Sequence, residues 1–416
     1  MTPALQTLDP AVGIARSFAI LPPERGGELW KVLVDIGLGA VDDYPLASVG
    51  AYDLTRRGAV ERAAGEAVER FALAAHADAV AYGTPERARV DARIEVRTPR
   101  AVDGLPLDSA WYRATVLSDA TEVLVPAEAI DDDGGRRHEA LGGTDPFDPS
   151  PSGTAAGLSL ERATRAALRE IIERDAVLCA WATRIGVRHT APASGDGDLR
   201  RLCDGAERRG LRPWLGLIPT SVPGAQVVCC AIIDRTVDGP LVSFGSKAAA
   251  SVVSATKGAL QEALQIHELL GNLRRRLERP RAFDVPSPAL VTDDVARAWW
   301  WTTPEAAESM VEWISTWGTA EPDDRGPEAE GTTSMDLVRG IVDDGGEPLR
   351  VDLTSRLGEL AQNLGWHVVK VLCPGYQPLR LDETLAATWD LERLAAWSHR
   401  YGLDAQLRTD LPHPLI

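Results

Sequence analysis

Two segments of this 416-residue chain carry the pattern Glu-x-x-Glu-Arg, at positions 66–70 and again at 170–174. Both segments have helical spacing, and residues three apart lie on one face of a helix. Each segment therefore presents two carboxylates and a nearby guanidinium to the same small volume. Apolar side chains surround both motifs, and charges in such a setting need partners or a metal ion. The fold must accommodate two helices of this kind.

The four glutamates of the two motifs suit a magnesium site. Mg²⁺ prefers carboxylate oxygens and keeps positions open for phosphate, to which arginine adds fork-shaped donors. The pattern therefore favours a Mg-nucleotide ligand. The alternative interpretation is a solvated helix face with weak ion pairs, which each motif taken alone favours. The candidate metal ligands are Glu66, Glu69, Glu170 and Glu173, and the candidate phosphate donors are Arg70 and Arg174.

Composition narrows the class of protein. The apolar content of 44% is sufficient for a large core. No apolar run approaches the roughly 20 residues that cross a bilayer, and the segment Met1–Ala4 lacks the features of a signal peptide. We therefore expect a cytoplasmic protein with no membrane partner. The net charge of −17 argues against binding to a nucleic-acid backbone.

Several common types of site have no signature in this sequence. The cysteines form no C-x-x-C pair and the histidines no metal-binding cluster, so we expect reduced core cysteines and no zinc. A G-x-S-x-G nucleophile motif and the usual glycine-rich phosphate loops are also missing. The five cysteines are Cys179, Cys203, Cys229, Cys230 and Cys373.

Helix-period stretches alternate with short β-rich runs, which predicts an α+β fold with long helices packed on β-sheets. The predicted helices are Gly58–His76, Leu160–Arg184, Ala248–Leu270 and Leu391–Tyr401. The predicted strands are Arg89–Arg97, Gln226–Asp234 and His367–Cys373. We expect a loop at 131–135, a tight turn or close backbone approach at 152–157, and a mobile insertion at 319–334. Three tryptophans at 299–301 indicate core or interface packing.

Five motifs, in order along the chain, resemble the YcaO family, particularly the cyclodehydratases that install azoline rings in ribosomally made peptides. The motifs lie at 64–70, at 152–157 leading to 170–176, at 259–265, at 374–379 and at 411–414. Asp175 and the Pro-His-Pro ending are most similar to the peptide cyclodehydratase branch. The resemblance covers most of the chain and implies one YcaO-type domain over 1–416, with 411–416 as a proline-containing tail.

This resemblance implies ATP-dependent backbone chemistry with ATP and Mg²⁺ as cofactors. A Cys, Ser or Thr side chain of a precursor peptide attacks the preceding amide carbonyl, and the oxygen takes the γ-phosphoryl group and leaves as phosphate. The implied cofactor-binding residues are Glu66, Glu69, Arg70, Glu170, Glu173, Arg174, Glu262 and Gln265. The implied residues at the reacting centre are Pro412, His413, Pro414 and Ile416, although His413 taken alone would be an exposed tail histidine.

Four positions depart from the family pattern. Leu158 stands where the family often has Asn, and Arg162 stands where it has a Glu of the nucleotide site. His267 replaces an Arg, and Ile416 replaces a terminal Pro. Glu161 is a candidate to compensate for Arg162, although neighbouring helix positions point about 100° apart. These departures support a second hypothesis, a non-catalytic YcaO-like scaffold subunit of a peptide-modifying complex.

The resemblance also implies partners and alternative reactions. We expect a precursor peptide and an E1-like protein that recognises its leader, because a YcaO domain fills this chain. An azoline dehydrogenase and a second copy of the chain are further candidate partners. Thioamide formation and amidine macrocyclisation share the phosphorylation chemistry but use sulfide or an amine as nucleophile. An unrelated Mg-dependent ATP hydrolase or ligase is a third class.

Overall fold

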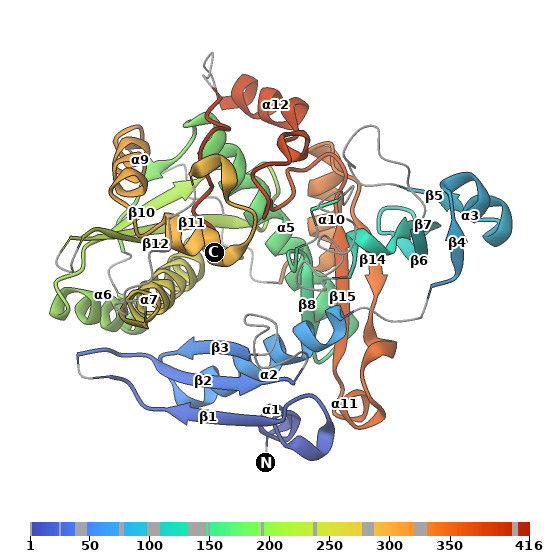
Figure 1. The fold of residues 1–416 in the computed structure, drawn as a ribbon, viewed down its shortest axis with the longest axis horizontal. Helices are drawn as coiled ribbons and strands as arrows, with labels where there is room; N and C mark the ends of the chain where they lie inside the picture. Colours follow the sequence, from blue (N-terminus) through green and yellow to red (C-terminus); the bar gives the residue numbers. More distant parts are fainter. Residues whose placement is uncertain are drawn as a thin grey trace. The chain divides into compact units, whose positions relative to one another are not determined.

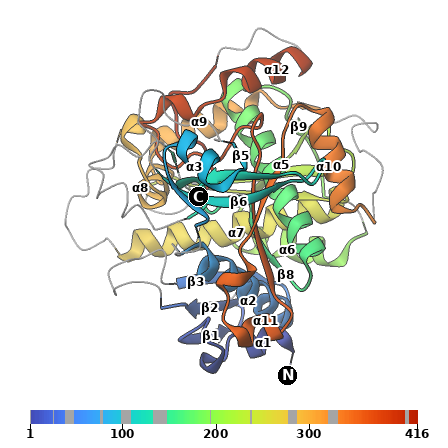
Figure 2. The ribbon, with the colours of Figure 1, turned by 90° about the vertical axis from the view of Figure 1, so that its right-hand side faces the viewer.

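The chain forms two compact units, each assembled from segments far apart in the sequence. Unit 1 consists of Met1–Pro23, Leu29–Ile171 and Thr333–Pro378, and unit 2 of Glu24–Glu28, Ile172–Thr332 and Leu379–Ile416. Helices and strands occur in both units, which confirms the predicted α+β class (Figures 1 and 2). The single domain stays a prediction. The computed structural model describes residues 2–24, 26–37, 48–74, 79–97, 109–131, 147–148, 150–192, 195–235, 239–276, 287–319, 331–401 and 407–416.

Unit 1 is organised around helix α2 (Arg56–Leu73), which packs against strands of two sheets. Ala63, Ala64 and Ala67 are fully buried, and their small side chains let the strands approach the helix closely. A three-stranded antiparallel sheet has the order β1 (Ser17–Leu21), β2 (Trp30–Asp35), β3 (Ser48–Asp53). The larger sheet has the order β5 (Glu95–Val96), β7 (Glu122–Pro126), β6 (Ser109–Val116), β14 (Leu349–Asp352), β15 (His367–Leu372), β8 (Thr154–Gly157), with β4 (Ala81–Gly83) paired to β6.

Unit 2 contains a five-stranded sheet covered by the long helix α7 (Val252–Arg276), which packs along β11 and β12 (Figure 1). A Cβ at Gly245 in β12 would collide with the backbone of Ala259 and Ala263, so only glycine permits this close packing. The strands are β12 (Leu241–Ala249), β11 (Gln226–Asp234), β10 (Pro213–Ile218), β9 (Arg188–His189) and β13 (Gly318–Thr319), in that spatial order.

Helix α5 (Leu160–Thr183) carries the second signature and passes from unit 1 into unit 2 after Ile171. Its last turns, Ala176–Ala182, are apolar all round and at most 2% exposed. Such a sequence forms an internal helix rather than an amphipathic surface helix. The helix ends at Thr183, and the next residue, Arg184, adopts a left-handed conformation with φ of 60°.

Shorter helices complete both units. Unit 1 contains α1 (Pro3–Thr7), α3 (Pro85–Ala92), α10 (Ser334–Asp343) and α11 (Glu359–Asn363). Unit 2 contains α6 (Gly197–Arg208), α8 (Asp294–Trp300), α9 (Pro304–Ser315) and α12 (Leu391–Tyr401). Trp300 and Trp301 are buried, which confirms core packing for the tryptophan run. In the described ranges, no helix combines the length and apolar character that a bilayer crossing needs.

Most predicted elements occur near their expected bounds. The predicted helices correspond to α2, α5, α7 and α12, and two predicted strands correspond to β11 and β15. Helix α7 begins four residues late because Ala248 and Ala249 still belong to β12. Cys179, Cys229 and Cys230 are buried free thiols, as expected, whereas Cys203 and Cys373 are half-buried free thiols.

The strand predicted at Arg89–Arg97 is wrong. Residues 85–92 form helix α3, and only Glu95–Val96 form a strand. The Thr84 side chain accepts a hydrogen bond from the Arg87 backbone, and Pro85 occupies the first helical turn. Both features start a helix and outweigh the alternating apolar pattern. Of the expected loop and insertion, 132–135 and 320–330 lie outside the described residues.

Candidate functional site

Three of the predicted metal ligands lie in unit 1, on two helices. Glu66 and Glu69 belong to α2, and Glu170 belongs to the first half of α5. All three side chains are half-buried. The charge of Glu170 acts on both α2 glutamates and raises their pKa. The fold therefore places Glu170 within electrostatic reach of both α2 glutamates, and the metal site itself stays a prediction.

The electrostatics of this acidic cluster are unfavourable without a cation. Burial raises the pKa of Glu69 to about 8, although the Ala156 backbone donates a hydrogen bond to its Oε1 at 2.8 Å. Burial likewise raises the pKa of Glu66, and the positive charge of Arg70 opposes this rise in both groups. A neighbouring guanidinium thus compensates the cluster only in part, so a divalent cation would stabilise it further.

The donor set of this cluster fits Mg²⁺ that arrives together with a nucleotide. Within the described ranges, no three His, Cys, Asp or Glu side chains are arranged to hold a metal ion by themselves. Mg²⁺ at a nucleotide site needs only one or two carboxylates, because phosphate oxygens and waters complete its octahedral shell. Glu66, Glu69 and Glu170 offer that kind of incomplete, all-oxygen shell.

The glycine-containing turn before α5 approaches other backbone closely, as predicted. Gly153 has a φ of 78°, and a Cβ there would collide with the carbonyl of Val371. A Cβ at Gly157 would lie 2.7 Å from the Ala163 nitrogen in the first turn of α5. These contacts fix the end of β8, whose Ala156 donates to Glu69.

Two of the positions that depart from the family pattern, Leu158 and Arg162, lie just beyond this turn. Leu158 is 45% exposed, and Arg162 is also exposed. Glu161 accepts hydrogen bonds from the Ser334 backbone, at 2.8 Å, and from the Ser334 hydroxyl. Glu161 is therefore held at the start of α10 and has a structural partner of its own.

The fourth predicted ligand, Glu173, lies in unit 2 in different surroundings. It is 2% exposed, and its two oxygens accept from the Ser246 hydroxyl at 2.7 Å and the Ala248 backbone at 2.9 Å. Lys247 and Arg174 each place a cationic nitrogen 3.8 Å from it. Burial acts to raise the pKa of Glu173, but these cations and hydrogen bonds outweigh it and lower the pKa. This carboxylate is stabilised by the protein itself.

Glu262 of α7 lies near Glu173 in unit 2. Its Oε2 accepts from the Ser246 backbone at 2.8 Å. Burial, reinforced by the charge of Glu173, raises the pKa of Glu262 to about 7, against the opposing effect of Arg174. Gln265 follows three residues later in α7, on the same helix face.

Asp175, which directly follows the second signature, has a structural role that the sequence did not reveal. Its two oxygens accept from Arg393 Nε at 2.9 Å and Nη2 at 2.6 Å. Both side chains are buried, and the pair joins α5 to α12. The two residues are 218 positions apart, so no local pattern could have indicated this contact.

The C-terminal tail is part of the interior of unit 2. Pro412, His413 and Pro414 are buried and Ile416 is half-buried. His413 is 0% exposed, so the alternative of an exposed tail histidine is wrong. The cause is tertiary, because its ring and its carbonyl have hydrogen-bond partners in distant segments of the same unit. The function of these residues at a reacting centre stays a prediction.

A family model described as YcaO cyclodehydratase, ATP- and Mg²⁺-binding, matches residues 51–377. The fold is similar to that of YcaO from Methanopyrus kandleri bound with AMPPCP and Mg²⁺, with a TM-score of 0.63, 22% identity, and coverage of 91% of this chain and 92% of that chain. The comparison with curated protein sequences finds no match.

Two further solved structures share the fold. A heterocyclase in complex with substrate and cofactor has a TM-score of 0.66 and 17% identity, with coverage of 99% of this chain but only 56% of that chain. The E. coli microcin synthetase McbBCD complex has a TM-score of 0.62 and 15% identity, with coverage of 86% of this chain and 88% of that chain. The chain thus spans little more than half the length of the heterocyclase.

Proposed function

Because this chain belongs to the YcaO family, we propose that it is the ATP-dependent cyclodehydratase subunit of a peptide-modifying system. ATP and Mg²⁺ are the cofactors of the family, in agreement with the sequence prediction. The proposed substrate is a ribosomally made precursor peptide whose Cys, Ser or Thr residues become azolines. The observation that carries the proposal is the under-compensated cluster of Glu66, Glu69 and Glu170.

In the proposed reaction, the sulfur or oxygen of the substrate side chain bonds to the carbonyl carbon of the preceding peptide bond. The carbonyl oxygen departs as phosphate, and the side chain and the amide nitrogen each lose a proton as the C=N bond forms. ATP with Mg²⁺ supplies the phosphoryl group that makes this oxygen a leaving group. The protein contributes positioning and charge stabilisation, which dominate catalysis of phosphoryl transfer.

Both units contain residues suited to this chemistry. In unit 1, Glu66, Glu69 and Glu170 would hold Mg²⁺, and Arg70 would donate to phosphate oxygens. In unit 2, Glu173 orders the Ser246–Ala248 backbone, and Arg174 and Lys247 supply positive charge beside it. Glu262 and Gln265 complete the proposed cofactor-binding set.

Similar proteins support the proposed partners. One is a heterocyclase in complex with substrate and cofactor, and another is the McbBCD complex. We therefore propose that this chain acts on its precursor peptide together with an E1-like, leader-recognising protein. An azoline dehydrogenase and a second copy of the chain stay predictions.

A scaffold subunit without catalysis is the second candidate function. The observation in its favour is the exposed Arg162, a base where the family has an acid. The test combines the chain with a precursor peptide, the leader-recognising protein, ATP and Mg²⁺, and follows the peptide by mass spectrometry. Loss of one water per ring, with matching phosphate release, supports the azoline proposal.

Three other outcomes of this test contradict the azoline proposal. Replacement of oxygen by sulfur would indicate thioamide formation. Loss of water in a macrocycle closed by an amine would indicate amidine formation. An unchanged peptide, together with no nucleotide binding, would favour the scaffold.

A further inference from the structure

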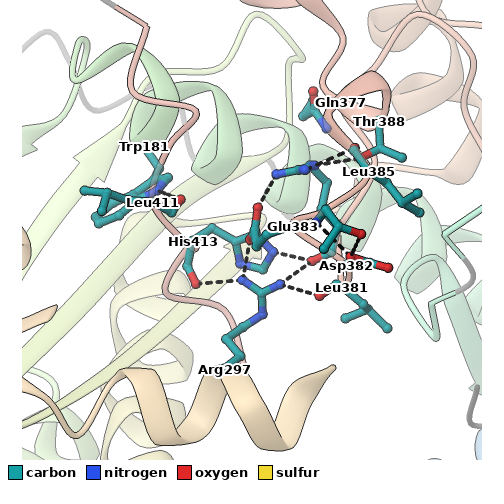
Figure 3. Close-up of polar contacts among 12 residues, drawn as sticks. Trp181, Arg297, Gln377, Leu381, Asp382, Glu383, Leu385, Thr388, Leu411 and His413 are labelled. Carbon is teal, nitrogen blue, oxygen red and sulfur yellow. Dashed lines mark hydrogen bonds and ion pairs between the residues drawn. The ribbon is translucent and has the colours of Figure 1, made fainter. Parts of the chain in front are cut away.

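A buried arginine in unit 2 contacts two segments near the end of the chain. Arg297 of α8 is 0% exposed. Its Nη1 donates to Glu383 Oε1 at 2.8 Å and to the His413 carbonyl at 3.3 Å. Its Nη2 donates to the carbonyls of Arg380 at 3.0 Å and Leu381 at 2.8 Å. Figure 3 shows the guanidinium between these groups.

Glu383 is shared between two buried arginines. Its Oε1 accepts from Arg297, and its Oε2 pairs with Arg380. Arg380 is itself fixed, because its Nε donates to the Thr388 hydroxyl at 2.7 Å and its guanidinium lies over the Trp389 ring. Buried charges are tolerated only when paired and hydrogen-bonded, and removing one partner is costly. The cluster is therefore rigid, and the loss of any one of its charged side chains should destabilise it.

The tail residue His413 joins this cluster through both its backbone and its ring. Its carbonyl also accepts from Trp301 Nε1 at 3.0 Å. Its Nε2 donates to the Arg380 carbonyl, and its Nδ1 accepts from the Leu415 backbone at 3.3 Å. Only the neutral imidazole with hydrogen on Nε2 satisfies both contacts. Burial and the charges of Arg297, Arg380 and Arg174 hold the pKa of His413 well below its usual range.

The same tail lies beside the second signature helix. The Leu411 carbonyl accepts from Trp181 Nε1 of α5 at 3.5 Å. The charge of Arg174, in the signature itself, acts on His413. Arg297 therefore contacts a tail whose His413 interacts electrostatically with Arg174, one of the candidate cofactor-binding residues of unit 2.

We propose that Arg297 and Glu383 form a clamp that positions the C-terminal tail, residues 411–416, beside α5, and that peptide turnover requires this positioning. Arg297 is a positioning residue, because it acts through the backbone of His413. The dependence of turnover rests on the proposed function. The claim that Arg297 and Glu383 hold the tail in place is independent of the proposed function.

Hydrogen exchange of the C-terminal peptide tests the clamp directly, in the full-length protein. We expect Arg297→Ala and the milder Glu383→Gln to speed exchange in the tail roughly tenfold or more, since local opening sets protection. Arg356→Lys is the matched control, because Arg356 pairs with Asp131 at 2.8 Å and both side chains are almost fully buried in unit 1. Wild-type protection of the tail in both clamp variants would overturn the proposal.

Kinetics with the complete peptide-modifying complex test the consequence. We expect Arg297→Ala to lower kcat about 100-fold with little change in peptide KM, because misplacement of about 1 Å costs that much. Arg297→Lys should restore part of the rate, and Arg356→Lys should retain it. A wild-type kcat in a variant with a loosened tail, or an equal loss in Arg356→Lys, would overturn the dependence of turnover on the clamp.

The two tests separate failure of the clamp from failure of the proposed function. If the wild-type complex does not modify the peptide, the proposed function is wrong, and with it the dependence of turnover on the clamp. Exchange then still decides whether Arg297 and Glu383 hold the tail.

Discussion

The last glutamates of the two Glu-x-x-Glu-Arg motifs, Glu69 and Glu173, hold the same place in the pattern but have opposite electrostatics. In unit 1, Glu69 accepts one hydrogen bond from Ala156, and its pKa rises to about 8. In unit 2, Glu173 has hydrogen bonds to both oxygens and two cationic neighbours, and its pKa is lowered. The motif places carboxylates, but the surrounding fold decides whether the protein neutralises them. The protein compensates the charges of the cluster in unit 1 only in part, whereas it stabilises the charge of Glu173 with hydrogen bonds and cations.

The largest expected effect comes from Glu69→Gln. This change should weaken Mg-nucleotide binding about 100-fold, because Mg²⁺ loses a charged ligand. Stability without nucleotide should be unchanged or higher, since the amide keeps an acceptor for Ala156 and removes repulsion from Glu66 and Glu170. Calorimetry with AMPPCP and thermal unfolding measure the two quantities. Unchanged affinity would remove α2 from the nucleotide site.

Glu173→Gln should show the reverse pattern, with a loss of stability. We expect the free energy of unfolding to fall by about 2 kcal/mol, because buried hydrogen-bonding partners are left mismatched. The Ser246 and Ala248 donors lose a charged acceptor, and Lys247 loses its counter-charge. Urea unfolding measures this effect, and Glu66→Gln is the matched control. Equal stability of wild type and Glu173→Gln would break the comparison.

The pH dependence of nucleotide binding should sharpen the comparison further. The folded protein keeps a proton on Glu69 up to pH about 8, whereas the unfolded chain releases it near the ordinary value of 4.5. The stabilising contribution of this group is therefore present below about pH 4.5 and lost as the pH rises through about 8. Binding of Mg²⁺ displaces the proton, so affinity should rise up to about tenfold per pH unit below pH 8.

Calorimetry in buffers of different ionisation enthalpy measures the protons released on binding. The release should be smaller in Glu69→Gln than in the wild type, and this difference separates the side chain from the titration of the nucleotide. Equal release in both proteins would show that Glu69 is already ionised.

The smallest effect is expected from Arg162→Glu, which restores the family acid. Arg162 is exposed and lies eight positions before Glu170, about 12 Å along the helix. This separation exceeds the Debye length of roughly 8 Å at physiological salt, so affinity should change less than about threefold. Calorimetric titration of the variant checks this. A gain above tenfold would show that the wild type lacks an essential acid.

The sequence predicted those parts of the fold that depend on local pattern. Strand β11 and helix α12 have the predicted bounds, and α5 differs by one residue, because apolar periodicity and length define such elements. The strand predicted from residue 89 was wrong over 89–92, because the alternating pattern does not take account of the Thr84 cap that starts helix α3. Local patterns therefore succeed where no capping signal competes with them.

Long-range partners could not be predicted from the sequence. The opposite states of Glu69 and Glu173 depend on donors 87 and 73 positions away. The burial of His413 depends on Arg297, 116 positions away. The motifs therefore identified the candidate residues, and their tertiary partners determined their charge and burial.

The most direct test is calorimetric titration of the purified chain with Mg²⁺ and AMPPCP near pH 8, alone and with its leader-recognising partner. We predict saturable binding by the wild type that Glu69→Gln abolishes or strongly weakens. The absence of binding in both settings would contradict the account and identify the acidic cluster of unit 1 as a remnant in a scaffold subunit.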